Sequence, residues 1–192
     1  MLLPAVTVTQ TPLSGVLVIE PRIFGDARGF FCETYHADRY AEAGIETRFV
    51  QDNVSRSGRG TLRGLHFQAP PHAQAKLVSC TDGSVFDVAV DLRAGSATYG
   101  EWFGAELSAA NMHQLLIPEG FAHGFVVTSE TALFSYKVSS FYAPHAEGSI
   151  AWNDASLAID WPVAEPILSD KDLAAPAFAA LAPMFAFDER PI

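Results

Sequence analysis

The chain has 192 residues, 49% of them hydrophobic, and a formal net charge of −10. This length and apolar share predict a single domain over residues 1–192, and the acidic balance argues against nucleic-acid binding, which requires lysine and arginine to neutralise phosphates. Two cysteines are too few for a disulfide framework, and the sequence shows neither a basic signal region nor an apolar run of the ~20 residues that span a membrane. We therefore expect a cytoplasmic protein with no membrane partner.

Apolar runs of strand length follow one another along most of the chain. Strands are predicted, in order, at residues 15–21, 29–35, 47–55, 76–80, 84–92, 113–118, 124–129 and 132–139. A short helix is predicted over residues 37–44, and helical turns broken by prolines over residues 172–185. The tripeptide TDG at residues 81–83 predicts a hairpin turn. Many short strands with little helix predict an all-β protein, best described as a double-sheet jelly roll.

Alternation with a period of two over residues 84–92 separates Asp87 and Asp91 from the large apolar side chains of that segment. The apolar face, which carries Phe86, Val88 and Val90, is predicted to lie in the core. The face with the two carboxylates fits two alternatives: the lining of a wet barrel interior, or the solvent face of an antiparallel sheet.

The segment RGLHFQAPPHAQAK, residues 63–76, concentrates an arginine, two histidines, two glutamines and a lysine in an apolar chain. Six of the twelve lysines and arginines lie between Arg39 and Lys76, together with only three acids. A locally positive segment on an acidic protein predicts a pocket for a small anionic ligand. A polar surface loop with scattered arginines is the alternative.

Three residues beside strand-like segments suggest proton transfer: His66, His123 and Tyr136. Two histidines are too few for a stable zinc or iron site, so no metal is expected. A histidine with a pKa of about 6.5 can instead act as a general base when a carboxylate orients it; the candidate carboxylates are Asp87, Asp91, Asp170 and Asp172. Lys76 can stabilise an enolate oxygen, and a tyrosine can return a proton from the opposite face. The alternative is that these side chains only pack in the core.

A series of motifs in a fixed order carries a family resemblance. They are PRIFGDARGFF, FVQDN, LRGLHFQ, QAKLV, GSVFDVAVDLR, LSAANMHQLLIPEGFAHGF, YK, EGSIAWND and LSDKD. In this order they resemble the dTDP-4-dehydrorhamnose 3,5-epimerase family over residues 15–172, followed by an Ala- and Pro-rich tail at 173–192 to which we assign no function. The resemblance implies a cupin-like jelly-roll barrel with a few short helices, no cofactor, and a homodimer whose N-terminal segment can pass to the neighbouring barrel.

The resemblance also implies a reaction and its residues. The chain would convert dTDP-4-dehydro-6-deoxy-D-glucose to dTDP-4-dehydro-L-rhamnose, in dTDP-L-rhamnose biosynthesis, by metal-free inversion at C3 and C5 through enolates. His66 matches the base, Tyr136 the acid, Lys76 the residue that holds the developing oxyanion, and Asp172 the carboxylate that orients His66, with Asp170 as the alternative. Positions that match contacts to the dTDP-sugar are Arg28, Glu33, Gln51, Asp52, Asn53, Arg63, His123, Glu147 and Lys171.

Five other functions stay open on the sequence alone. Members of such a family can epimerise only C3 or only C5, or isomerise a 4-keto to a 3-keto sugar. A metal-dependent cupin oxygenase and a non-catalytic sugar-nucleotide-binding module are alternatives from other classes. Arg56 and Arg59, in the segment NVSRSGRGTL, match no role that we can assign.

Overall fold

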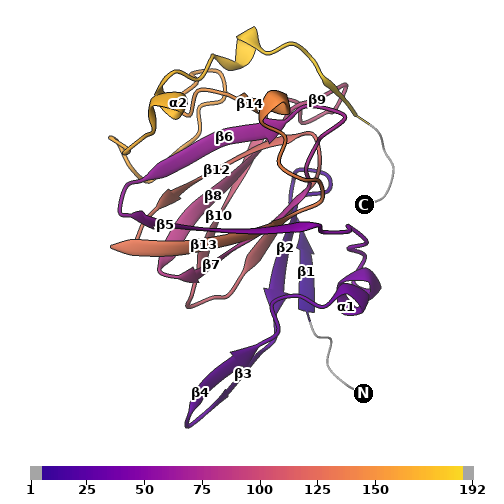
Figure 1. Cartoon of the computed structure of the whole chain (residues 1–192), viewed down its shortest axis with the longest axis vertical. Coiled ribbons are helices and arrows are strands. Elements are labelled where there is room, and N and C mark those ends of the chain that lie inside the picture. Colours follow the sequence, from indigo (N-terminus) through magenta and orange to yellow (C-terminus); the bar gives the residue numbers. More distant parts are fainter. Residues whose placement is uncertain (1–5, 188–192) are drawn as a thin grey trace.

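Two antiparallel sheets face each other in the computed structural model, which describes residues 6–187 (Figure 1). The six-stranded sheet has the order β1 (Val6–Gln10), β2 (Leu17–Pro21), β11 (Gln114–Ile117), β7 (Lys76–Asp82), β13 (Thr131–Val138) and β5 (Gln51–Gly58). The five-stranded sheet has the order β10 (Trp102–Ser108), β8 (Ser84–Asp91), β12 (Phe121–Val127), β6 (Leu62–Gln68) and β14 (Glu147–Ser149). This arrangement confirms the predicted double-sheet jelly roll.

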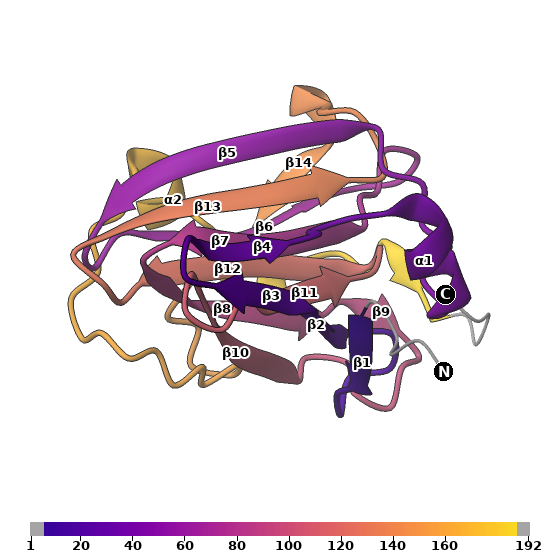
Figure 2. The same cartoon turned by 90° about the horizontal axis from the view of Figure 1, so that it is seen from below.

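The remaining elements are short. Strands β3 (Ile23–Asp26) and β4 (Gly29–Cys32) form a separate hairpin, which projects away from both sheets (Figure 1). The predicted short helix is α1 (Ala37–Glu42), and the predicted terminal turns are α2 (Asp170–Leu173) and the 3-10 turn η2 (Phe178–Ala180), while a second 3-10 turn, η1, covers Pro144–Ala146. Helices α1 and α2 lie at opposite ends of the molecule (Figure 2).

Apolar side chains from the inner faces of both sheets form the core between them. Val78 of β7 and Phe134 of β13 meet Val85 and Ala89 of β8 in this cluster, each with at most 1% exposure. The carboxylate-bearing face of β8 therefore lines the barrel interior, and the solvent-face alternative is wrong.

The opposite face of β8 is buried as well. Val88 and Val90 pack beneath Trp161 and Phe185, which come from the C-terminal part of the chain. Phe185 belongs to β15 (Phe185–Ala186), which pairs in parallel with β9 (Arg93–Ala94). The Ala- and Pro-rich tail, as far as residue 187, thus covers the outer face of the five-stranded sheet; residues 188–192 lie outside the described part.

The turn at residues 81–83 is not a hairpin, contrary to the sequence prediction. Strand β7 pairs with β11 and β13, whereas β8 pairs with β10 and β12 in the other sheet, so the chain crosses between sheets at Gly83. Gly83 has φ +76°, and a Cβ there would come within 2.0 Å of the carbonyl oxygen of Thr131. The local pattern located the turn correctly, but it could not show that the two strands belong to different sheets.

Candidate active site

A pocket of about 310 Å³ opens into the barrel next to α2. Its lining comes from both sheets and from α2, namely Ser55, Arg63, His66, Lys76, His123, Phe125, Phe134, Tyr136, Ser169, Lys171 and Asp172. All four residues predicted to be catalytic line this pocket, together with three of those predicted to bind the dTDP-sugar. One cavity therefore collects side chains that lie far apart in the sequence.

His66 and Asp172 form a hydrogen-bonded pair in this pocket. Nε2 of His66 lies 2.5 Å from Oδ1 of Asp172, whose side chain is only 4% exposed. Ser169 is the N-cap of α2 and fixes this carboxylate: its Oγ donates to Oδ2 of Asp172 at 2.8 Å and accepts from the Asp172 amide at 3.2 Å. Burial raises the pKa of Asp172, but the hydrogen bonds from His66 and Ser169 outweigh it and lower the pKa below its usual value.

Of the four candidate carboxylates, the structure brings Asp172 to His66. Asp170, two residues earlier on α2, is exposed. Asp87 instead pairs with His123, with Oδ2 at 2.9 Å from Nε2, and Asp91 pairs with Arg93. Because Asp172 occupies Nε2 of His66, Nδ1 is the ring nitrogen left to accept a proton.

Lys76 and Tyr136 line the same pocket from β7 and β13. Lys76 is buried, and its Nζ makes one long contact of 3.5 Å to the carbonyl oxygen of His66. Burial lowers the pKa of Lys76 to about 8, although the charges of Asp87 and Glu147 raise it. Burial also raises the pKa of Tyr136, so the phenol stays protonated and can donate a proton.

A second group of predicted residues lies near α2 and β5. Each carboxylate oxygen of Glu147 has a partner. Oε1 forms an ion pair with Nζ of Lys171 at 2.5 Å, and Oε2 accepts a hydrogen bond from the Tyr142 hydroxyl at 3.1 Å. The side-chain amide of Gln51 donates to Oδ1 of Asn53 at 2.9 Å and accepts from the Tyr142 amide at 3.0 Å. Tyr142, which the sequence did not single out, thus contacts two of the predicted residues, Gln51 and Glu147.

The comparisons with known proteins decide the family. The family model described as dTDP-4-dehydrorhamnose 3,5-epimerase matches residues 10–180. The chain belongs to this family. The dTDP-4-dehydrorhamnose 3,5-epimerase of Pseudomonas aeruginosa is 56% identical over 173 residues, which are 89% of this chain and 95% of the relative.

Other epimerases of the family are similar in structure and in sequence. A dTDP-6-deoxy-D-glucose-3,5-epimerase of Legionella pneumophila, solved in complex with dTDP-4-keto-L-rhamnose, matches with a TM-score of 0.91 at 49% identity and covers 95% of this chain and 99% of that one. A dTDP-4-dehydrorhamnose 3-epimerase of Streptomyces niveus is 45% identical over 161 residues, 83% of this chain and 78% of the relative. The fold is the cupin-like jelly roll of these epimerases.

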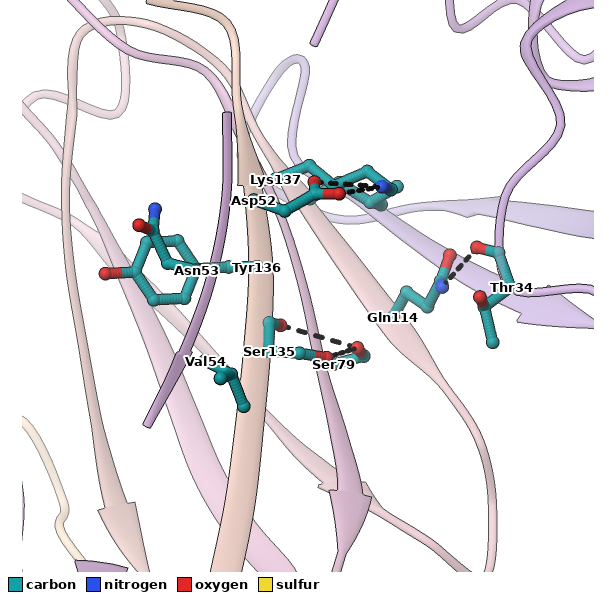
Figure 3. A pocket seen from close by; sticks show the side chains of 10 residues that line it. Thr34, Asp52, Asn53, Val54, Ser79, Gln114, Ser135, Tyr136 and Lys137 are labelled. Atoms are coloured by element: carbon teal, nitrogen blue, oxygen red, sulfur yellow. Dashed lines mark hydrogen bonds and ion pairs between the residues drawn. The ribbon is translucent and has the colours of Figure 1, made fainter. Parts of the chain in front are cut away.

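Six of the nine positions that match the family's substrate contacts do not line the His66 pocket. Gln51, Asn53 and Glu147 belong to the group described above, and the other three, Asp52, Arg28 and Glu33, form ion pairs elsewhere. Asp52 and its neighbour Asn53 both line a second pocket of about 340 Å³, in which Asp52 pairs with Lys137 at 2.9 Å (Figure 3). Arg28 lies at the tip of the β3–β4 hairpin with its side chain 90% exposed, bound to Asp26. Glu33 pairs with Arg39 instead. Within one chain, none of these three residues contacts His66.

Two further findings concern the whole described part of the chain. Across residues 6–187, no three His, Cys, Asp or Glu side chains gather closely enough to hold a metal ion. The helices in this range are too short or too polar to cross a membrane.

Of the two arginines without a predicted role, Arg59 pairs with Glu130 on the surface at 2.9 Å.

Proposed function

We propose that this epimerase inverts both C3 and C5 of dTDP-4-dehydro-6-deoxy-D-glucose and yields dTDP-4-dehydro-L-rhamnose. The observation that carries the proposal is the convergence of the His66–Asp172 pair, Tyr136 and Lys76 on one pocket. The C4 ketone of the substrate acidifies the hydrogens on C3 and C5, so a base, an acid and an oxyanion donor suffice. Because neither carbon changes its oxidation state, the reaction needs no redox cofactor.

His66 acts as the base in this scheme. Its Nδ1 takes the hydrogen of C3 as a proton, and the electron pair of the broken C–H bond forms the enolate, with the negative charge on the C4 oxygen. Asp172 supports this role by fixing the ring and stabilising the imidazolium that forms. The same steps repeat at C5.

Tyr136 and Lys76 complete each inversion. The ammonium group of Lys76 holds the enolate oxygen, and the Tyr136 hydroxyl delivers a proton to the opposite face of the carbon, so the ketone re-forms with inverted configuration. Each half-cycle leaves a protonated imidazole and a phenolate, which return to their starting states by proton exchange with water. The raised pKa of Tyr136 supports a phenol that starts the cycle protonated.

The diphosphate of the substrate requires cationic side chains at the pocket. Arg63 lines the pocket and donates from Nε to Ser57 Oγ at 3.1 Å, and no carboxylate pairs with it within residues 6–187. Lys171 lines the same pocket beside Glu147. The planar guanidinium of Arg63 suits the paired oxygens of a diphosphate, and we assign it that role.

A two-fold homodimer is part of the proposal. The β3–β4 hairpin leaves the barrel with Phe24, Phe30 and Phe31 at least 50% exposed, a surface that a partner barrel would bury. Passage of an N-terminal segment to the neighbouring barrel is also what the family resemblance implies. In such a dimer Arg28, at the hairpin tip, would serve the partner's pocket rather than its own. A cytoplasmic protein without nucleic-acid or membrane partners completes the proposal.

Inversion at C3 alone is the second candidate function. It is favoured by the likeness to the Streptomyces niveus 3-epimerase.

Incubation with dTDP-4-dehydro-6-deoxyglucose in deuterium oxide, followed by NMR, distinguishes the candidate functions. Double inversion places deuterium at C3 and C5 and gives the L-rhamno product. Deuterium at C3 or C5 alone would restrict the function to one carbon, and a 3-keto product would indicate an isomerase. Bound ligand with no exchange would indicate a binding module, and activity that needs added iron would indicate an oxygenase.

A further inference from the structure

His123, which lines the pocket, forms a second histidine–carboxylate pair with Asp87, a buried residue that has no role in the scheme above. Nε2 of His123 lies 2.9 Å from Oδ2 of Asp87; the His123 side chain is 7% exposed and that of Asp87 is 0% exposed. A carboxylate fully removed from water destabilises the fold unless charges or hydrogen bonds compensate for it. Its other oxygen, Oδ1, is buried and has no hydrogen-bond partner within residues 6–187. The hydrogen bond to His123 therefore satisfies only one of the two oxygens of this carboxylate.

Lys76 carries the opposite charge and is buried as well, although it forms no ion pair with Asp87. Its ammonium group is buried in the same pocket, with a single long contact to a backbone oxygen at 3.5 Å. Burial lowers the pKa of Lys76 most strongly, and the charge of Asp87 is the largest influence that raises it again. The effect is mutual, since His123 and Lys76 both oppose the rise that burial causes in the pKa of Asp87. Asp87 and Lys76 thus favour each other's charged form from within the same buried region, without direct contact.

We propose that Asp87 is a positioning residue of the epimerase: one carboxylate oxygen fixes the tautomer of His123, and the negative charge keeps the Lys76 ammonium in place to hold the enolate oxygen. The inference rests on the proposed role of Lys76. Asp87, on β8, would act through His123 on β12 and Lys76 on β7, without touching the substrate itself.

The protonation of the cluster follows from charge balance. One buried carboxylate and one buried ammonium cancel, so a neutral His123 keeps the cluster neutral, and burial lowers the pKa of His123 in agreement with this. The neutral ring then donates from Nε2 to Asp87, which leaves Nδ1 as an acceptor. Nδ1 of a neutral His123 can then only accept a hydrogen bond, so the enolate oxygen depends on Lys76 as its donor.

Other charged groups act on the same cluster. The charge of Glu147 on β14 raises the pKa of Lys76, and that of Lys171 on α2 lowers it. His66 on β6 lowers the pKa of His123. Glu147 and Lys171 are paired with each other at 2.5 Å, so their effects on Lys76 oppose one another. Asp87 is then the group whose removal changes the charge around Lys76 most.

The first test uses the wild-type protein and needs no catalysis. Histidine labelled with 15N in the ring reports by NMR which nitrogen carries the proton, and His123→Gln assigns the signal. We expect the neutral Nε2-protonated tautomer of His123 near neutral pH. A neutral ring protonated at Nδ1, or an imidazolium, would overturn the inference.

The second test is the pH dependence of kcat in Asp87→Asn, which keeps the shape and the acceptor oxygen but removes the charge. We expect the alkaline limb of kcat to move to lower pH by about one unit, because one opposite charge near Lys76 is lost. A purely structural role would lower kcat at every pH and leave the limb where it was, and that result in a folded variant would refute the inference. Asp91→Asn is the matched control, since Asp91 lies on the same face of β8 but pairs with Arg93. If Lys76 had no catalytic role, the wild-type enzyme would lack the limb near pH 8 and kcat would fall only where Tyr136 ionises, above pH 10. That result separates failure of the proposed function from failure of this inference.

Discussion

His66 and Asp172 are separated by 106 positions in the sequence, yet Nε2 of one lies 2.5 Å from Oδ1 of the other. The contact joins β6, in the five-stranded sheet, to a four-residue helix near the C-terminus. Ser169 fixes the carboxylate by accepting from its amide and donating to its second oxygen. The imidazole therefore has one nitrogen held and one nitrogen free, as a general base requires.

The first prediction concerns this pair. His66→Asn should lower kcat by about 10²–10⁴-fold, because the proton acceptor is lost. Asp172→Asn should lower kcat as well while leaving KM little changed, because an amide neither stabilises the imidazolium nor specifies the same tautomer. Steady-state kinetics with circular dichroism as the check on folding would measure both effects. The matched control is Asp170→Asn, an exposed neighbour on the same helix, which should retain wild-type activity; equal losses in both Asp variants would argue against a specific role of Asp172.

The second prediction separates the acid from the base. Tyr136→Phe removes only the hydroxyl, so His66 can still abstract protons while delivery to the opposite face fails. The variant should exchange hydrogen for deuterium from the solvent and yield little epimerised product. NMR of the sugar in deuterium oxide would measure exchange and inversion together. Tyr99→Phe, in a tyrosine that packs on Phe178, serves as the control, and full epimerisation by Tyr136→Phe would contradict the assignment.

The third prediction is an alkaline limit on activity. The pKa of Lys76 is lowered to about 8, so the ammonium is present below that pH and is lost as the pH rises through it. A neutral amine stabilises the enolate oxygen less, and kcat should therefore fall above a pH of about 8. In Lys76→Arg the guanidinium stays protonated, so whatever activity remains should lack this alkaline limb. The prediction fails if the limb has the same position in both proteins.

The sequence pattern predicted the fold class because most strands carry apolar runs. It missed β6, although this strand carries His66, the proposed base. Within LRGLHFQ the polar side chains of Arg63 and His66 and the glycine at position 64 interrupt the alternation that identifies a strand. These interruptions have a physical reason, since Arg63 and His66 line the pocket and Gly64 lies where a Cβ would come within 2.5 Å of Gly124 Cα. The residues that line the pocket thus break the alternation by which β6 could have been predicted.

The candidate site was predictable as a set of residues but not as an arrangement. Asp170 and Asp172 are equivalent in a sequence pattern, and only the turn that Ser169 begins decides which one faces His66. Asp87 was a candidate partner of His66, and its pairing with His123 depends on how β8 and β12 align. Arg28 matches a family position, but its place on a projecting hairpin could not be read from local sequence.

The fourth prediction tests whether Arg28 acts in the partner's pocket. Light scattering should give a mass about twice the 20.7 kDa of the chain. His66→Asn and Arg28→Gln should each reduce activity as pure dimers. A heterodimer with one copy of each variant should regain activity at one site, where an intact His66 meets the intact Arg28 of its neighbour. If Arg28 served its own pocket, both sites of the heterodimer would carry one defect and no activity would return.

The last prediction distinguishes binding from catalysis among the cations of the pocket. The charge of the diphosphate is the same in the ground state and in the transition state, so Arg63 contributes to the binding of both equally. Arg63→Gln should therefore raise KM and change kcat less. Lys76 faces an oxygen that becomes negative only as the proton leaves carbon, so Lys76→Met should lower kcat strongly with a smaller change in KM. A loosely held diphosphate also misplaces the sugar ring, which adds some loss of kcat to Arg63→Gln. The two variants nevertheless differ in which constant changes most, and steady-state kinetics on both measures this. A defect confined to KM in Lys76→Met would make Lys76 a second phosphate ligand, and the enolate oxygen would then need another donor.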